Sequence, residues 1–204
     1  MKKLSAIALV LVLALALALT AAFSMEDSDT PNAKDALPIG AAAPDFTLPD
    51  ADGRAHPLAS LKGKSGTLIL FVATKCPVSN AYNARMQKLA DDYRARGINV
   101  VGINSNVAEP GPEVKEHAAA NGLTFPILKD PGNKIADSYG AQVTPEAYLL
   151  DASGKLVYHG RIDNARSGYL ITSTELRDAA EAVLAGKPVG KAEVKAFGCS
   201  IKRG

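Results

Sequence analysis

The sequence lacks a strong excess of either charge, has no tryptophan and contains only two cysteines among 204 residues. Lysine and arginine number 23 and aspartate and glutamate 21, so the formal net charge is +2. Nucleic acids and acidic membrane surfaces are bound by strongly basic patches, and the charge balance argues against both partners. The sequence also shows no internal repeat, which excludes an array of repeated units.

The first 24 residues have the composition of a secretory signal. Two lysines precede residues 4–22, which carry no charge, and Ser24 ends the segment just before an acidic stretch. A basic start, an apolar stretch and small residues at a cleavage site define such a signal, so we expect a periplasmic or secreted protein. The alternative is an uncleaved membrane anchor with the domain outside the cytoplasm, because the stretch approaches the roughly 20 residues that cross a bilayer.

Removal of this segment leaves the basic and acidic residues equal in number, at 21 each. No cysteine lies near its end, which excludes lipid attachment through one. The remaining chain of about 180 residues is enough for one domain with a sizeable core. We therefore expect a signal at 1–24, a flexible linker at 25–38, a domain at 39–190, and a tail at 191–204 that carries Cys199.

The hydrophobic pattern predicts strands that alternate with helices. Apolar runs predict buried strands at 67–72 and 98–104, and two β-rich runs joined by a short turn predict a hairpin over 146–151 and 155–162. This order predicts an α/β fold with a central mixed sheet and helices on both faces. The expected helices are 80–96, 113–121, 134–139 and 174–185, and shorter extended segments are expected at 44–48 and 125–128.

Cys76 lies where a predicted strand turns into a predicted helix. Free amides and the dipole at a helix N-terminus favour a negative group, so the pKa of a thiol there falls and more thiolate forms near neutral pH. Lys75 adds a positive charge next to it, and Pro77 suits a first helical turn because its missing N–H is not needed there. The alternative is a buried cysteine that acts as a small apolar side chain.

Three segments resemble known redoxins. Residues 71–79 (FVATKCPVS) resemble the active-site run of periplasmic thioredoxin-like proteins, approximately F-W-A-T-W-C-P-P-C. Residues 40–53 (GAAAPDFTLPDADG) resemble the leading segment of the alkyl hydroperoxide reductase and thiol-specific antioxidant superfamily. Residues 198–202 (GCSIK) resemble the ending of a subgroup of bacterial redoxin-domain proteins. The resemblance covers about residues 39–203.

This resemblance implies a thioredoxin-like fold and an oxidoreductase whose nucleophile is Cys76. It implies no cofactor, disulfides of proteins or small molecules as substrates, and an external thiol reductant. It also implies that the Thr144–Pro145 bond is cis, that Pro145 faces Cys76, and that Thr144 offers its backbone to a bound substrate. Cis bonds are essentially confined to proline, and the alternative is an ordinary trans proline before a strand.

The sequence departs from the thioredoxin pattern at two points. The tryptophans are replaced, and Ser79 stands where thioredoxins have their second cysteine, so Cys76 cannot close a local disulfide. We expect Ser79 to hydrogen-bond the thiolate instead. A mixed disulfide formed by Cys76 must be resolved by another thiol, for which Cys199 is the candidate. The alternatives for Cys199 are a bridge to another chain and an unpaired thiol.

A thiol peroxidase is the alternative function, with peroxides as its substrates. Peroxiredoxins have threonine three residues before the cysteine, where this chain has Ala73. They also need an arginine near the thiolate. The candidates are Arg85, Arg161 and Arg166.

A copper-binding module of the same fold is a third hypothesis, because thiolate and imidazole suit copper. Of the three histidines, His159 on the second hairpin strand is the candidate, although an exposed strand histidine is the simpler interpretation. No second cysteine lies near Cys76 in the sequence, so we predict no metal site.

Overall fold

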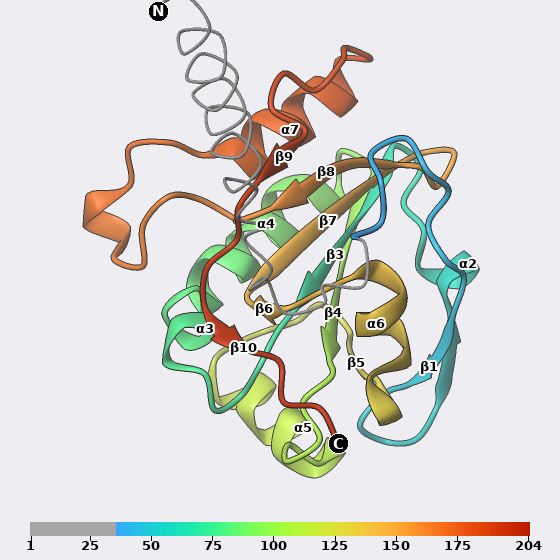
Figure 1. Cartoon of the computed structure of the whole chain (residues 1–204), viewed down its shortest axis with the longest axis vertical. Helices are drawn as coiled ribbons and strands as arrows, with labels where there is room; N and C mark the ends of the chain where they lie inside the picture. Colours follow the sequence, from blue (N-terminus) through green and yellow to red (C-terminus); the bar gives the residue numbers. More distant parts are fainter. Residues whose placement is uncertain (1–35) are drawn as a thin grey trace, which may run out of the picture. The chain divides into compact units, whose positions relative to one another are not determined.

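The computed structural model describes residues 36–204, so the predicted signal and nearly all of the predicted linker lie outside the described residues. Its centre is a six-stranded sheet in the order β5-β4-β3-β7-β8-β9 (Figure 1). β3, β4 and β5 are parallel, whereas β7 is antiparallel to both β3 and β8. The mixed sheet is confirmed. Its strands are β3 (Gly66–Phe71), β4 (Ile98–Asn104), β5 (Ile127–Lys129), β7 (Glu146–Asp151), β8 (Leu156–Gly160) and β9 (Glu193–Val194).

Helices cover both faces of this sheet, as predicted. Side chains alternate between the faces of a strand, so Leu68 and Leu70 of β3 pack with Leu89 on one face while Ile69 and Phe71 pack on the other. The first face is covered by α4 and α7, and the second by α2 and α6. The helices are α2 (Leu58–Leu61), α3 (Pro77–Ala81), α4 (Asn83–Arg94), α5 (Gly111–Ala120), α6 (Lys134–Tyr139) and α7 (Glu175–Leu184), and a separate hairpin pairs β1 (Thr47–Pro49) with β2 (Ala55–Pro57).

The helix predicted at 80–96 is two helices. The chain enters α3 at Pro77 and leaves it at Tyr82, whose ψ of −4° interrupts the regular turn before α4 begins. The break places the Tyr82 ring in the core, 1% exposed, with its hydroxyl donating to Asp163 at 3.0 Å. The apolar spacing continues across this single residue, so periodicity alone predicts one helix.

The tail folds back onto the domain rather than extending from it. β9 pairs with β8, and β10 (Cys199–Ser200) pairs antiparallel with β6 (Val143–Thr144). In Figure 1 the tail passes α3 on its way to β10.

At the N-terminal end of the domain, Leu37 is buried and its amide donates to the Tyr139 carbonyl at 3.2 Å. Ordered packing therefore begins before Ile39.

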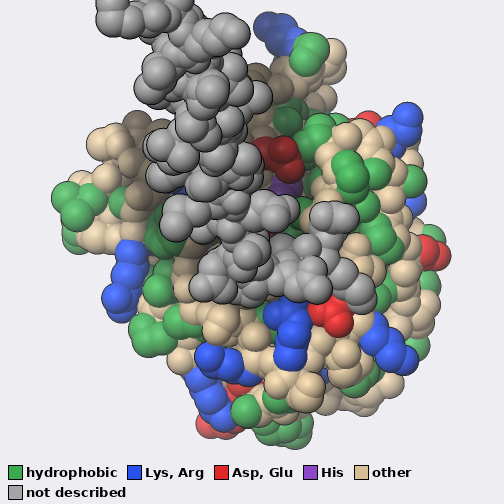
Figure 2. Space-filling model, in the orientation of Figure 1, with side chains coloured by type: hydrophobic (Ala, Val, Ile, Leu, Met, Phe, Trp, Pro, Cys, Tyr) green, Lys and Arg blue, Asp and Glu red, His purple; other side chains and the backbone are tan. Residues whose placement is uncertain are grey.

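Two further observations concern the surface and the membrane. Where Figure 2 shows described side chains, lysines and arginines are spread among acidic and apolar residues, in keeping with the nearly neutral composition. Within residues 36–204, no helix combines the length and the hydrophobicity that crossing a membrane requires.

Candidate active site

Cys76 caps the first turn of α3, after the short loop 72–75 that follows β3. Its sulfur accepts a hydrogen bond from the Ser79 amide at 3.3 Å, and its thiol donates to the Thr144 carbonyl at 3.3 Å. The side chain is 3% exposed. Pro77 occupies the first position of the helix, as predicted, where no N–H is needed. The thiol is therefore held at a helix N-terminus by backbone groups from two distant segments.

Cys199 lies next to Cys76, and the two thiols are free. Burial raises the pKa of the Cys76 thiol, but hydrogen bonds from the Cys199 thiol and the Ser79 amide outweigh it, so the pKa falls below the ordinary cysteine value. The same hydrogen bond raises the pKa of Cys199, and burial adds to that increase. The pair is thus polarised in the sense that Cys76 is the more acidic thiol and Cys199 the less acidic one.

The Thr144–Pro145 peptide bond is cis, as expected. The residue before the proline contacts Cys76 through its carbonyl and pairs with Cys199 across the β6–β10 ladder. The Thr144 side chain is 2% exposed, and its hydroxyl has no hydrogen-bond partner. The structure therefore brings Cys76, Cys199 and Thr144 together from three separate parts of the chain.

Lys75 and Ser79 contribute differently from the prediction. The Lys75 ammonium points to Glu113 at 2.9 Å and to the Ala108 carbonyl at 2.9 Å, so it is engaged away from the sulfur. The Ser79 hydroxyl accepts from the Ala73 amide at 3.2 Å, and it is the Ser79 backbone amide that reaches the sulfur. The thiol is contacted by two backbone groups, the Ser79 amide and the Thr144 carbonyl, rather than by these two side chains.

Glu109 is a site residue that the sequence analysis missed. Its buried carboxylate accepts hydrogen bonds from the Thr74 amide at 2.9 Å and the Lys75 amide at 3.0 Å, directly before Cys76. Burial raises the pKa of Glu109, but these bonds and that from Asn104 outweigh it and lower the pKa. Its position in the chain could have indicated this role. Glu109 follows β4 as Cys76 follows β3, and loops after adjacent parallel strands lie at the same edge of a sheet.

Two of the three arginines considered for peroxide chemistry are engaged elsewhere. Arg85 donates to Asp163 at 2.7 Å and lies 3.5 Å above the Tyr82 ring. Arg161 bonds Glu175, and Arg166 is exposed. In the described part of the chain, no hydrogen bond joins any of these guanidinium groups to Cys76.

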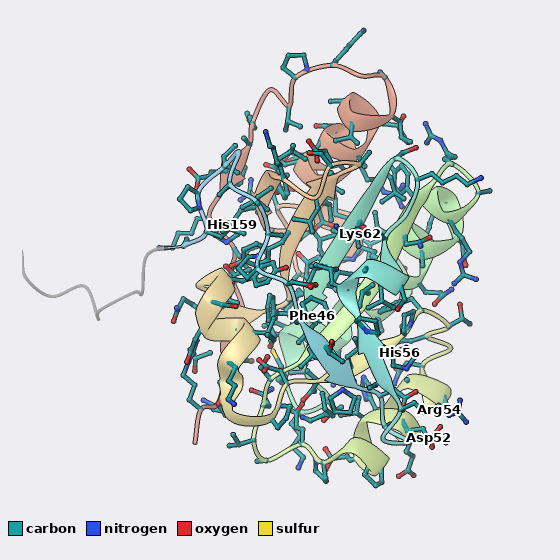
Figure 3. All side chains as sticks on the ribbon, turned by 90° about the vertical axis from the view of Figure 1, so that its right-hand side faces the viewer. Phe46, Asp52, Arg54, His56, Lys62 and His159 are labelled. Atoms are coloured by element: carbon teal, nitrogen blue, oxygen red, sulfur yellow. The ribbon has the colours of Figure 1, made fainter. Side chains whose placement is uncertain are left out.

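In residues 36–204, no hydrogen bond joins a histidine to Cys76 or Cys199. His159 is not the exposed strand residue that was expected, because it stacks on Tyr148 with ring centres 4.4 Å apart and bonds Glu146 at 2.6 Å. His56 lies on β2, well separated from His159 in the view of Figure 3. Across residues 36–204, no three His, Cys, Asp or Glu side chains converge in an arrangement that could hold a metal ion.

The polarised pair gives a direct prediction for the pKa of Cys76. Cys199→Ser retains a hydroxyl that can donate to the Cys76 thiolate, whereas Cys199→Ala removes the donor. We expect the pKa of Cys76 to be higher in the alanine variant, and the rate of alkylation by iodoacetamide against pH will measure it. Equal midpoints in the two variants would show that Cys199 does not stabilise the thiolate.

Comparisons with known proteins agree with this site. The AhpC/TSA family model matches residues 39–159, more than half of the chain. The thiol-disulfide oxidoreductase ResA of Geobacillus thermodenitrificans is 35% identical over 123 residues, covering 60% of this chain and 69% of that protein. A Mycobacterium tuberculosis relative, provisionally named a peroxiredoxin, is 31% identical over 133 residues, covering 59% of this chain and 83% of that protein.

A solved structure of a hypothetical protein from Sinorhizobium meliloti has a TM-score of 0.78 and 40% identity, covering 83% of this chain and 97% of that one. Thioredoxin-like neighbours among the solved structures confirm the expected fold. The matched family segment includes the Cys76 turn and the Thr144–Pro145 bond that face each other in the structure. The chain belongs to the AhpC/TSA family and is a thioredoxin-like oxidoreductase.

Proposed function

We propose that the chain is an exported dithiol oxidoreductase in which Cys76 attacks a disulfide and Cys199 resolves the product. The observation that carries this proposal is the meeting of the two thiols at Thr144, whose carbonyl accepts from the Cys76 thiol and which pairs with Cys199, although more than 100 residues separate the cysteines. The name of the ResA relative supports disulfides as substrates. Export is proposed from the signal-like residues 1–24.

In the first step, the Cys76 thiolate attacks one sulfur of a substrate disulfide. A new S–S bond forms between Cys76 and that sulfur, and the other substrate sulfur leaves as a thiolate. The Ser79 amide stabilises the attacking thiolate, and the Cys199 thiol does so while the tail is docked. The Thr144 backbone is proposed as the docking edge for the substrate.

In the second step, Cys199 resolves the mixed disulfide. Once Cys76 is bonded to the substrate its negative charge is gone, so the interaction that raises the pKa of Cys199 is lost and its thiolate forms more readily. That thiolate attacks the Cys76 sulfur, forms the Cys76–Cys199 disulfide and releases the second substrate thiolate. Two electrons have then passed to the substrate, and an external thiol reductant restores both thiols.

Thiol peroxidase activity is the second candidate, and the same pair of cysteines supports it. The Cys76 thiolate would attack the O–O bond of a peroxide, release an alcohol or water and become a sulfenic acid, which Cys199 would convert to the same disulfide with loss of water. The engagement of Arg85 and Arg161 by buried carboxylates favours disulfide exchange over this reaction.

Single-turnover reactions of the reduced protein will test this proposal. We expect faster oxidation by a small aromatic disulfide than by hydrogen peroxide at equal concentration. Peptide mapping under non-reducing conditions should give a linked Cys76–Cys199 peptide from monomeric protein. Cys199→Ser should stop at a stable mixed disulfide on Cys76, and Cys76→Ser should not react.

Two outcomes would contradict the proposal. Faster reaction with hydrogen peroxide would assign the chain to the thiol peroxidases. Links between chains only, or two free thiols after oxidation, would make Cys76 a lone thiol that depends on a second protein for resolution.

A further inference from the structure

The C-terminal tail lies along the strand edge that the proposed function assigns to substrate. β10 pairs antiparallel with β6, so that Cys199 is opposite Thr144 and Ser200 is opposite Val143. One further bond extends the ladder, from the Ile201 amide to the Gln142 carbonyl at 2.9 Å. We call residues 142–144 the docking edge and residues 197–201 the tail strand. In the structure, the docking edge is already occupied by the chain itself.

Alternate residues of the tail strand face the domain, as the period of two in a β-strand requires. Phe197 packs on Tyr82 with ring centres 6.3 Å apart, and Ile201 is 5% exposed in the core cluster that also contains α2 and α6 side chains. Between them, Cys199 presents its sulfur to Cys76. The tail strand thus offers an aromatic side chain, a sulfur and an aliphatic side chain at intervals of two residues.

The residue before Cys199 must be glycine for this arrangement. A Cβ atom built on Gly198 would lie 2.0 Å from the Thr144 carbonyl oxygen, and no Cβ tolerates a backbone atom at that distance. The contact is with the backbone of the docking edge, so a flexible side chain cannot relieve it. Gly198 is therefore what allows the tail strand to approach closely enough to place Cys199 at Cys76.

We infer that the docking edge recognises an extended segment of a substrate protein with the pattern aromatic, glycine, cysteine, any residue, aliphatic, and that the tail strand is an internal copy of that substrate. This inference rests on the proposed role of Cys76 as the attacking thiol. A protein substrate reaches Cys76 by replacing the tail strand, since both make the same antiparallel bonds to Thr144 and Gln142. A disulfide of free cysteine has no extended segment and cannot form these bonds to the docking edge.

The test uses a synthetic peptide with the sequence of residues 196–202 (AFGCSIK), whose cysteine carries 2-nitro-5-thiobenzoate as a mixed disulfide. Attack by the Cys76 thiolate joins Cys76 to the peptide sulfur and releases the coloured nitrothiobenzoate anion. The small probe is the same mixed disulfide of free cysteine. All proteins carry Cys199→Ser, so Cys76 is the only protein thiol.

Gly198→Ala is expected to accelerate the peptide reaction by about tenfold, the effect of a 1.4 kcal/mol loss in tail docking, and to change the small-probe reaction much less. Gly190→Ala is the matched control, because a Cβ on this glycine, just before the tail, has no atom within 4 Å. It should react like the parent with both probes. A peptide with serine in place of its phenylalanine and isoleucine should react more slowly than AFGCSIK.

A second variant, Ile201→Ser, loosens the tail strand without a backbone clash and should also favour the peptide. Equal peptide rates in the Gly198→Ala and Gly190→Ala proteins would overturn the inference while the small-probe reaction upholds the proposed function. Acceleration of both probes alike would mean that the tail merely shields the thiol, which also overturns it. No reaction with the small probe in any variant would refute the proposed function, and this inference would fall with it.

Discussion

Oxidation of the two thiols to a Cys76–Cys199 disulfide is expected to raise the free energy of unfolding by about 4–5 kcal/mol. The bond would close a loop of more than 100 residues, and the chain-entropy model gives a gain of about this size for such a loop. Because Cys76 and Cys199 already lie together in the reduced fold, the folded state should change little. The gain therefore comes from restriction of the unfolded chain.

Urea unfolding of the oxidised and reduced protein will measure this difference as a shift in midpoint. Cys199→Ser treated with the same oxidant is the control and should show no shift. An oxidised protein no more stable than the reduced one would mean that bond formation distorts the Cys76 turn or the β6–β10 pairing by a compensating amount.

Glu109→Ala is expected to destabilise the protein by about 3–5 kcal/mol, the range found when one partner of a buried charged network is removed. The substitution leaves the Thr74 and Lys75 amides without their acceptor. Each unsatisfied buried donor costs about 1–3 kcal/mol. It also removes the negative charge near the half-buried Lys129 ammonium, whose pKa burial lowers and Glu109 raises.

Glu113→Ala is the matched control, since Glu113 bonds the Thr74 hydroxyl and the Lys75 ammonium from the exposed side of the same turn. Exposed ion pairs contribute little, so a much smaller loss is expected. Chemical denaturation of both variants gives the comparison, and similar losses would show that the buried carboxylate is not what holds the turn.

Glu109 also makes the stability of the folded protein depend on pH. Because the pKa of Glu109 is lower in the folded state than in the unfolded chain, its stabilisation is complete above the ordinary glutamate pKa and is lost as the pH falls through the lowered one. Glu109→Gln cannot titrate, and its stability should therefore decline less over that acidic range than that of the parent protein.

The fold was largely predictable because its central elements are continuous in sequence. β4, β7 and α6 have the bounds that were predicted for them. Each of these elements is defined by residues that are neighbours along the chain. The hydrophobic pattern of the sequence predicts such elements well.

The features that were not predicted depend on contacts between distant segments. Strand β10 has only two residues and exists because β6 lies opposite, so no local pattern marks it. Glu109 stands in a segment rich in proline and glycine that reads as a surface loop, and its burial depends on two backbone amides at 74 and 75. Resemblance identified Cys76 and the cis bond, but only the structure shows which backbone groups surround the thiol.

The late position of Cys199 in the chain has a consequence for biosynthesis. Ribosomes add about 5–20 residues per second and the amino-terminal part of a protein folds first. The strands up to Gly160 are therefore made a few seconds before Cys199 is added. During this interval Cys76 is the only thiol of the growing polypeptide, and β6 has no neighbour at its edge. Each newly made molecule thus passes through a single-thiol stage in which its first sulfur meets other molecules before its own second sulfur.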